Sequence, residues 1–225
     1  MAYTTQMTKI TAVCFDVGET VVDETREYGT WADWLGVPRH TFSAVFGAVL
    51  ARGGDYRETF QYFVPGFDLA KEREKRAVAG KAETFSEEDL YNDARACLAA
   101  LQKQGLHVAL AGNQTARAEG ILRSLKLPVD TIGTSDSWGV EKPSAAFFKR
   151  IVQELGRPAQ EILYVGDRLD NDVGPAQKSG MQTALIRRGP WGYILKQLNV
   201  EEKCLCILDA LAELPDLVAA HNTGS

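Results

Sequence analysis

The sequence contains little cysteine and no long apolar run. Its 225 residues include four cysteines, too few for a disulfide framework in a chain of this size. No stretch approaches the roughly 20 apolar residues that a membrane-spanning helix needs, and the polar first residues do not resemble a signal peptide. These absences predict a cytoplasmic protein without a membrane-spanning segment.

Two of the cysteines, Cys204 and Cys206, lie two residues apart and would share one face of a strand. Such a pair supplies half of a zinc-type site, but the sequence has no second pair. We therefore expect small buried side chains at both positions.

An excess of basic residues is also lacking. The formal net charge is −5 and no basic stripe is present, so nothing favours a nucleic-acid partner. An anionic substrate is still permitted, because a bound cation can reverse the local field. Hydrophobic residues make up 45% of the chain, and its length suits one large domain or a core with a smaller insert.

Strand and helix patterns alternate along most of the chain. Short apolar runs predict strands, and periodic apolar residues predict helices between them. The expected strands are 12–15, 106–111, 129–133, 162–165 and 182–186, and the expected helices are 115–125, 144–155 and 172–179. A short apolar stretch (204–208) and a helix (209–220) follow. This order predicts an α/β fold, with a parallel sheet covered by helices on both faces.

Residues 24–82 do not follow this alternation. They show helical periodicity and turn signals without a convincing strand, and residues 71–81 are charged like a solvated helix face. We expect a helical insert directly after the first strand, with residues 23–83 as its domain and residues 1–22 and 84–225 as the core. A helix should begin at Ser86, which is a good N-cap, and end at Gly105.

Polar residues follow four of the predicted strands. They are Asp16, the stretch 111–114, the stretch 138–143 and the stretch 165–172. In a parallel sheet these junctions meet at the carboxyl edge, where open α/β sheets bind ligands. Taken singly, each has a structural explanation: a turn, a helix cap or a surface lysine. Taken together, their order favours a site.

These residue types suit phosphoryl chemistry on a metal ion. Asp16 and Asp167 can hold Mg²⁺, which prefers oxygen ligands, and Asp172 can reach the ion or orient its water. Lys142 supplies a positive charge for a phosphate oxygen or for the Asp16 carboxylate. A carboxylate nucleophile beside Mg²⁺ and a lysine can form an aspartyl-phosphate intermediate.

Four motifs resemble those of the haloacid dehalogenase (HAD) superfamily. Phe15-Asp16-Val17-Gly18-Glu19-Thr20 is similar to its first motif, Gly112-Asn113 to the second, Gly139 to Pro143 to the lysine motif, and Gly166-Asp167 with Asp172 to the acidic fourth motif. The resemblance covers nearly the whole chain. It implies a Rossmann-like core, a small helical cap and Mg²⁺.

The resemblance also implies roles for individual residues. Asp16 and Lys142 would be catalytic. The metal ligands would be Asp16, the backbone carbonyl of Gly18, Asp167 and Asp172. The phosphate would be bound by Thr20, Gly112, Asn113 and Lys142.

Two positions depart from the family pattern. Phosphatases of the family have a second aspartate two residues after the nucleophile as general acid and base, and here that position is Gly18. Gly112 likewise replaces the hydroxyl of the second motif. A positioned acid–base group contributes about 10²–10⁴-fold, so a cap residue or water would have to replace it. Glu19 is expected to point elsewhere, and His40 is a candidate, although a lone histidine is more often structural.

The sequence thus predicts a Mg²⁺-dependent phosphatase for a small phosphorylated metabolite. One alternative is an impaired protein that binds Mg²⁺ and a phospho-ligand. Another is a hydrolase of carbon–phosphorus or other C–X bonds, and phosphonate cleavage would need a cap lysine such as Lys71, Lys75 or Lys81. Nucleic acid and membrane are not expected as partners, and oligomeric state stays open. Cap residues that can line the pocket, each more often core or surface, are Tyr28, Trp31, Arg39, Tyr56 and Arg57.

Overall fold

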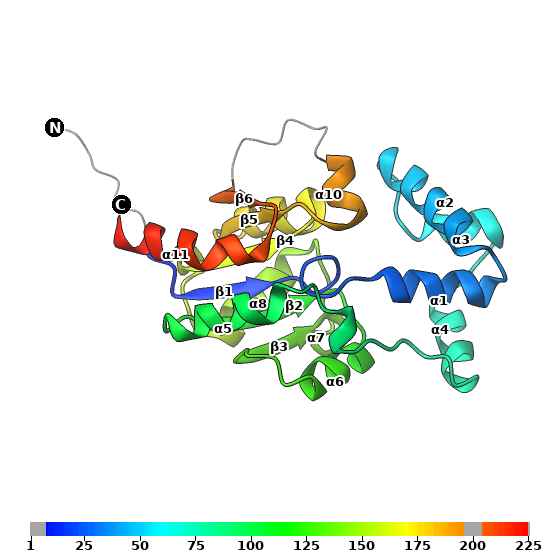
Figure 1. Ribbon diagram of the computed structural model, residues 1–225, viewed down its shortest axis with the longest axis horizontal. Coiled ribbons are helices and arrows are strands. Elements are labelled where there is room, and N and C mark those ends of the chain that lie inside the picture. The colour runs from blue at the N-terminus through cyan, green and yellow to red at the C-terminus, as the bar shows by residue number, and fades with distance from the viewer. Residues whose placement is uncertain (1–7, 196–203, 225) are drawn as a thin grey trace.

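The computed structural model describes residues 8–195 and 204–224. Six strands form one parallel sheet in the order β3-β2-β1-β4-β5-β6 (Figure 1). The strands are β1 (Ala12–Phe15), β2 (His107–Gly112), β3 (Thr131–Thr134), β4 (Ile162–Gly166), β5 (Gln182–Ile186) and β6 (Cys206–Leu208). The predicted α/β class and the Rossmann-like arrangement are confirmed, because β1 lies inside the sheet with β2 and β4 on either side.

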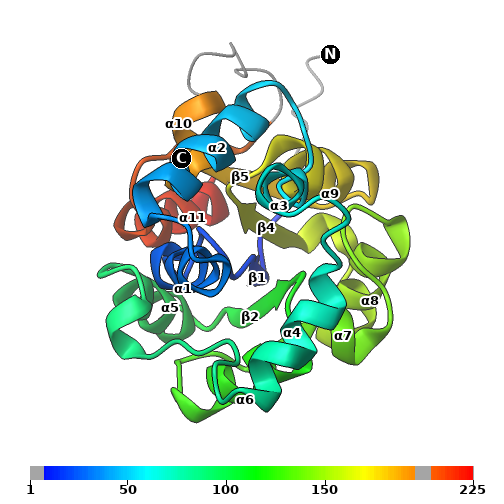
Figure 2. The same cartoon turned by 90° about the vertical axis from the view of Figure 1, so that its right-hand side faces the viewer.

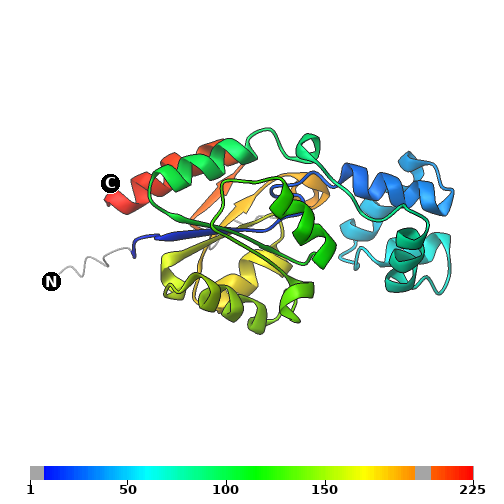
Figure 3. The same cartoon turned by 90° about the horizontal axis from the view of Figure 1, so that it is seen from below.

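Helices cover both faces of the sheet (Figure 3). Alternate residues of β1 explain this, since Val13 and Phe15 belong to one apolar core and Ala12 and Cys14 to another. The first core is completed by α5 (Ala94–Lys103), α6 (Ala116–Ser124) and α11 (Leu214–Thr223). The second is completed by α8 (Ala145–Leu155) and α9 (Gly174–Lys178).

Four helices form a separate cluster beyond the carboxyl edge of the sheet (Figures 1 and 2). They are α1 (Thr25–Leu35), α2 (Arg39–Ala51), α3 (Glu58–Phe63) and α4 (Leu69–Val78), called the helical insert below. Aromatic side chains such as Trp31, Phe42 and Phe60 form its own core. Trp191 of α10 (Gly189–Leu195) packs against it, with ring centroids 5.6 Å apart for Trp191 and Phe46. The division at residues 23 and 83 stays a prediction.

The helix expected from Ser86 begins later. Ser86 and Asp89 form a reciprocal capping box around a 3₁₀ turn, η1 (Glu87–Asp89), and Leu90 then forms an antiparallel bridge with Val22. The extended backbone at Leu90 ends the turn, so α5 starts at Ala94. Ser86 and the acidic residues after it do begin a helical turn, as predicted, but the bridge between Leu90 and Val22 ends the helix after that turn.

Two other segments differ from the sequence prediction. Residues 172–179 do not form one helix, because a π-helical turn, η3 (Leu169–Val173), precedes α9. The helix expected at 209–220 is a 3₁₀ turn, η4 (Leu211–Glu213), followed by α11. Two further short elements are α7 (Ser135–Trp138) and the 3₁₀ turn η2 (Ala159–Glu161). Cys204 and Cys206 are free and half-buried rather than buried.

In the described part of the chain, no helix combines the length and apolar character needed to span a membrane.

Candidate active site

Three acidic side chains meet at the carboxyl edge of the sheet. Asp16 follows β1, Asp167 follows β4, and Asp172 lies in η3. One carboxylate oxygen of each lies within 4.8 Å of the others, and all three residues are buried. Because β1 pairs directly with β4, the two strands end side by side. The structure therefore brings together the aspartates that the sequence placed at this edge.

A glycine allows Asp172 to approach the strand end. A Cβ added at Gly166 would lie 2.6 Å from the Cβ of Asp172, which leaves no space for a larger residue unless the turn moves. The Oδ2 atom of Asp172 accepts a hydrogen bond of 3.0 Å from the backbone N–H of Arg168. Its Oδ1 atom faces Lys142, at 2.6 Å from Nζ.

Lys142 is buried between two of these carboxylates. Its Nζ atom lies 2.7 Å from Oδ1 of Asp16 and 2.6 Å from Oδ1 of Asp172. Burial alone would lower the pKa of Lys142, but the charges of Asp16 and Asp172 outweigh it and raise the pKa above its usual value. The ammonium group therefore stays protonated at neutral pH.

The side chain of Asn113 positions the backbone of Lys142. Its amide nitrogen donates to the Lys142 carbonyl at 2.9 Å, and its amide oxygen accepts from the Lys142 N–H at 2.8 Å. These two bonds connect the end of β2 to the loop before α8. Asn113, predicted to bind phosphate, has its amide engaged with Lys142 in this structure.

The carboxylates fit a divalent cation. Oδ2 of Asp167 is buried and has no hydrogen-bond partner among the described residues. Burial raises the pKa of Asp167 well above its usual range, as do the charges of Asp172 and Asp16. Burial likewise raises the pKa of Asp172 to about 6, against the opposing effect of Lys142. One ammonium group is not enough for three buried carboxylates, and hard oxygen ligands are those that Mg²⁺ prefers.

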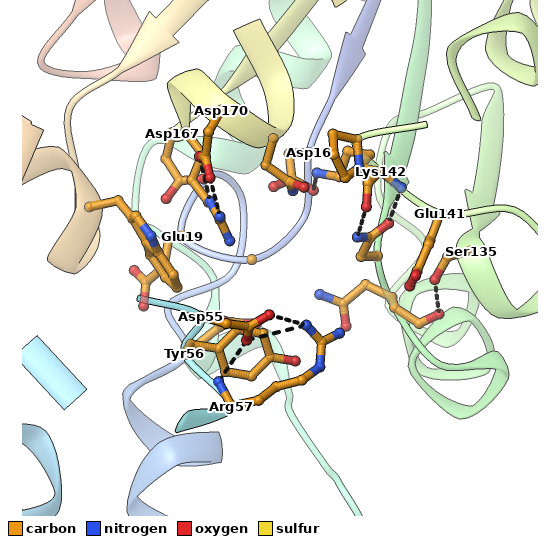
Figure 4. Close-up of a pocket in the computed structure, with 18 of the residues that line it drawn as sticks. Asp16, Glu19, Asp55, Tyr56, Arg57, Ser135, Glu141, Lys142, Asp167 and Asp170 are labelled. Atoms are coloured by element: carbon orange, nitrogen blue, oxygen red, sulfur yellow. Dashed lines mark hydrogen bonds and ion pairs between the residues drawn. The ribbon is translucent and has the colours of Figure 1, made fainter. Parts of the chain in front are cut away.

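A cavity of about 530 Å³ opens above these groups (Figure 4). Asp16, Lys142 and Asp167 lie on one side of it, and Asp55, Tyr56 and Arg57 of the helical insert lie on the other. The Arg57 guanidinium contacts the Asp55 carboxylate at 3.1 Å and lies 4.7 Å from the centre of the Tyr56 ring. The cavity is thus a polar space between the sheet edge and the insert, with acidic and basic groups facing each other.

The family model of haloacid dehalogenase-like hydrolases matches residues 10–180, which contain all of these groups. The chain belongs to the haloacid dehalogenase-like hydrolases. The sequence resemblance to this family is confirmed.

Curated relatives of this HAD-like hydrolase include proteins named as phosphatases. It is 37% identical over 89 residues to a glyceraldehyde 3-phosphate phosphatase of Methanocaldococcus jannaschii, covering 40% of this chain and 37% of the relative. It is 32% identical over 141 residues to a ribulose-1,5-bisphosphate 5-phosphatase of Halopiger xanaduensis, covering 60% of this chain and 59% of the relative. The chain thus spans between 37% and 59% of the length of these two relatives.

A longer match is found with a glyceraldehyde 3-phosphate phosphatase of Pyrococcus furiosus, 25% identical over 96% of both chains. Among solved structures, the HAD-hydrolase YfnB of Bacillus subtilis, bound to magnesium, superimposes with a TM-score of 0.68 at 18% identity. That match covers 93% of this chain and 99% of the other. At this identity the likeness shows a shared fold.

Of the predicted site residues, five line the cavity and three do not. The lining residues are Asp16, Gly18, Asn113, Lys142 and Asp167, while Thr20, Gly112 and Asp172 lie outside the lining. Thr20 is fully buried, and its hydroxyl has no hydrogen-bond partner among the described residues. A Cβ at Gly112 would lie 2.5 Å from Oδ1 of Asp16, so this glycine leaves space for the Asp16 carboxylate.

The insert residues divide in a similar way. Tyr28, Tyr56 and Arg57 line the cavity, whereas Trp31 is buried in the core of the insert. Arg39 is exposed and paired with Asp33, and His40 is exposed on α2 and does not line the cavity. Lys71 and Lys75 form ion pairs on α4 with Asp68 and Glu72, and Lys81 lies near Trp34. Within the described chain, Lys142 is the lysine that lines the cavity.

Glu19 lines the cavity but is held by a neighbour. It adopts a positive φ of 53° and accepts a hydrogen bond of 2.5 Å from the Tyr91 hydroxyl. Burial raises the pKa of Glu19 to about 7, although the Tyr91 hydrogen bond opposes the shift. The expectation that Glu19 points elsewhere is therefore only half right, because the residue still faces the cavity.

Glu24 is a lining residue that sequence reasoning missed. It directly precedes α1, and its carboxylate lies against Gly18. Burial raises the pKa of Glu24 well above its usual range, as do the charges of Glu19 and Asp16. The sequence did contain one signal, because Glu24 is an acid six residues after Gly18, the position where the family pattern has an aspartate. The helical pattern of residues 24–82 placed Glu24 in the insert and gave no reason to expect it beside Gly18.

Proposed function

We propose that this HAD-like hydrolase is a Mg²⁺-dependent phosphatase that hydrolyses a small phosphorylated molecule through an aspartyl-phosphate on Asp16. The observation that carries the proposal is the contact of Asp16 with the buried Lys142 ammonium, at 2.7 Å, beside the unpartnered oxygen of Asp167. The curated relatives named as phosphatases of small phosphorylated sugars support the same substrate class.

In the proposed reaction, Asp16 is the nucleophile and Lys142 orients it. Lys142 holds Oδ1 of Asp16, which leaves Oδ2 to attack phosphorus. The bond from phosphorus to the leaving oxygen breaks, and that oxygen takes a proton. Water then attacks the phosphorus of the aspartyl-phosphate, which releases inorganic phosphate and restores the Asp16 carboxylate. Lys142 balances the negative charge that accumulates during both steps.

Asp16, the carbonyl of Gly18 and Asp167 would hold Mg²⁺, with Asp172 as a further ligand or as the partner of a bound water. The ion would polarise the phosphoryl oxygens and shield their charge from Asp16. Glu19, Asp55 and Arg57 would meet the part of the substrate beyond its phosphate.

Turnover of an aryl phosphate with and without Mg²⁺ tests the proposal. We expect activity that requires Mg²⁺ and that an Asp16→Asn substitution abolishes. An Asp16→Asn variant as active as the unchanged protein would refute it.

Gly18 favours one second candidate, a protein that binds Mg²⁺ and a phospho-ligand without turning it over. This candidate predicts Mg²⁺-dependent binding of a phosphorylated molecule with zero turnover across a broad screen of phosphometabolites. Robust hydrolysis of any of them would exclude it. Phosphonate cleavage has less support, because Lys71, Lys75 and Lys81 do not line the cavity.

A further inference from the structure

The space beside Gly18 is already occupied by another carboxylate. An ideal Cβ built on Gly18 would lie 2.5 Å from Oε1, 2.7 Å from Cδ and 3.1 Å from Oε2 of Glu24. An acid of the family type at position 18 would extend its side chain into this space. The carboxyl group that the first motif lacks is therefore supplied there by a residue from the start of the insert.

The local backbone explains how Glu24 reaches this place. The chain turns back after Val17, whose carbonyl accepts hydrogen bonds from the N–H groups of Val21 and Val22 at 2.9 Å each. Val22 forms a bridge with Gly18, which brings the following residues over the glycine. The Asp23 carboxylate then accepts a hydrogen bond from the Thr25 N–H at 2.8 Å, at the start of α1. This turn fixes the position from which the Glu24 side chain extends.

The carboxylate of Glu24 is not committed to another contact. It makes no capping bond to α1, and it has no hydrogen-bond or ion-pair partner among the described residues. Its charged neighbours Glu19 and Asp16 have the same sign. It faces the cavity that holds Asp16 and Lys142.

Most other carboxylates that line the cavity are already engaged, and Glu141, which is not engaged within the described chain, is exposed and does not lie against Gly18. Glu19 is held by Tyr91, Asp55 by Arg57, and Asp170 by Arg168. Asp136 accepts a hydrogen bond from the Ala116 N–H. Asp167 belongs to the carboxylate group that fits the cation.

We propose that Glu24 is the general acid and base of this hydrolase. The inference rests on the proposed phosphatase function and adds its proton donor. In the first step the Glu24 carboxyl gives its proton to the leaving oxygen as the bond from phosphorus to that oxygen breaks. In the second, the Glu24 carboxylate takes a proton from water while the water oxygen bonds to phosphorus and the Asp16–phosphorus bond breaks. The sum is phosphate ester plus water giving alcohol plus inorganic phosphate.

The test compares Glu24→Gln with the unchanged protein on an alkyl phosphate and on p-nitrophenyl phosphate. An alkoxide is a poor leaving group, so we expect kcat for the alkyl phosphate to fall by about 10²–10⁴-fold. The nitrophenolate needs no proton, so the variant should still release a rapid burst of it before slow turnover. The burst also shows that the variant is folded. Glu74→Gln is the matched control, because Glu74 is an exposed insert glutamate outside the cavity lining, and it should retain full activity.

A reciprocal exchange gives a second readout. In a Glu24→Ala background the space beside residue 18 becomes free, and adding Gly18→Asp should recover at least part of the alkyl phosphatase activity. Recovery supports the assignment, since a merely structural glutamate would not be replaced by an aspartate on another segment.

Two results would overturn the role of Glu24. One is alkyl phosphate hydrolysis by Glu24→Gln at the unchanged rate. The other is an equal loss for both substrates without a burst, combined with no recovery in the exchanged variant. Failure of the phosphatase function itself would look different, because the unchanged protein would then be inactive or insensitive to Asp16→Asn.

Discussion

Lys142 is buried among carboxylates, and the charge balance of the site depends on it. Its ammonium group contacts both Asp16 and Asp172, while Asp167 is left without a hydrogen-bond partner within the described chain. At the scale of single residues, three buried carboxylates therefore face only one ammonium group within the described chain, and the site carries an excess of negative charge. Lys142 relieves part of this repulsion, and a bound cation would relieve more of it.

A Lys142→Met variant should show this dependence. The substitution keeps the approximate length of the side chain but leaves the Asp16 and Asp172 carboxylates without their ammonium partner. Removing one partner of a buried ion pair costs about 3–5 kcal/mol. We expect a lower free energy of unfolding in urea and loss of phosphatase activity. Unchanged stability would show that Asp16 and Asp172 do not need the ammonium group.

Asp93 gives a prediction for pH. Its carboxylate forms two bonds with Arg188, at 3.0 and 2.7 Å, and accepts a third from the Leu211 N–H. Burial raises the pKa of Asp93, but these bonds outweigh it and lower the pKa below the usual 3.8. Because the pKa of Asp93 is lower in the folded state, its ion pair with Arg188 stabilises the fold above pH 3.8. This stabilisation is lost as the pH falls through the pKa that Asp93 has in the folded state.

We therefore expect Asp93→Asn to lower the free energy of unfolding at pH 7 by roughly 3 kcal/mol. The difference from the unchanged protein should shrink as pH falls below 3.8. Urea unfolding at several pH values measures it. Asp33→Asn, which breaks an exposed pair with Arg39, is the control and should have a much smaller effect. An Asp93 effect that grows toward acid pH would contradict the assignment.

At the scale of elements, the turn η3 determines where Asp172 lies. Gly166 ends β4, and its missing side chain is what allows the Asp172 side chain to approach. The turn is short and π-helical rather than the start of a regular helix.

Gly166→Ala should displace this turn, because its Cβ would meet the Cβ of Asp172 at 2.6 Å. We expect activity to fall at least tenfold, corresponding to about 1.4 kcal/mol in the barrier. Kinetics at saturating substrate measure the loss. Gly120→Ala in α6 has no atom within 4 Å of its added Cβ, so it should stay active and fold at least as stably. Equal activities for the two variants would show that the turn tolerates the contact.

At the scale of the molecule, the proposed cation site would join β1, β4 and η3, and it would exist only in the folded chain. A ligand that binds the native state alone stabilises it by about 2.7 kcal/mol at one hundred times its dissociation constant. Mg²⁺ should therefore raise the thermal unfolding temperature, and Asp167→Asn should abolish the increase. The comparison uses scanning calorimetry with and without Mg²⁺. An equal increase in both proteins would place the ion elsewhere.

The sheet could be predicted because its strands are short apolar runs separated by helical patterns. The convergence of Asp16 and Asp167 followed from parallel strand order, since parallel strands end at one edge. The start of α5 could not be predicted, because the bridge between Leu90 and Val22 is a tertiary contact with no local signal. The same holds for Glu24, whose place beside Gly18 results from the turn over residues 17–23. Local patterns assign residues to elements, and they do not show which side chains a loop brings together.

The most direct test of the account is to identify the residue that carries the phosphoryl group during turnover. The protein would be mixed with an aryl phosphate and Mg²⁺, quenched in acid, digested and examined by mass spectrometry. We predict a phosphorylated peptide containing Asp16, stronger in Glu24→Gln, where its hydrolysis is slowed, and absent in Asp16→Asn. Steady turnover with the phosphoryl group on another residue, or with none on the protein, would contradict the account.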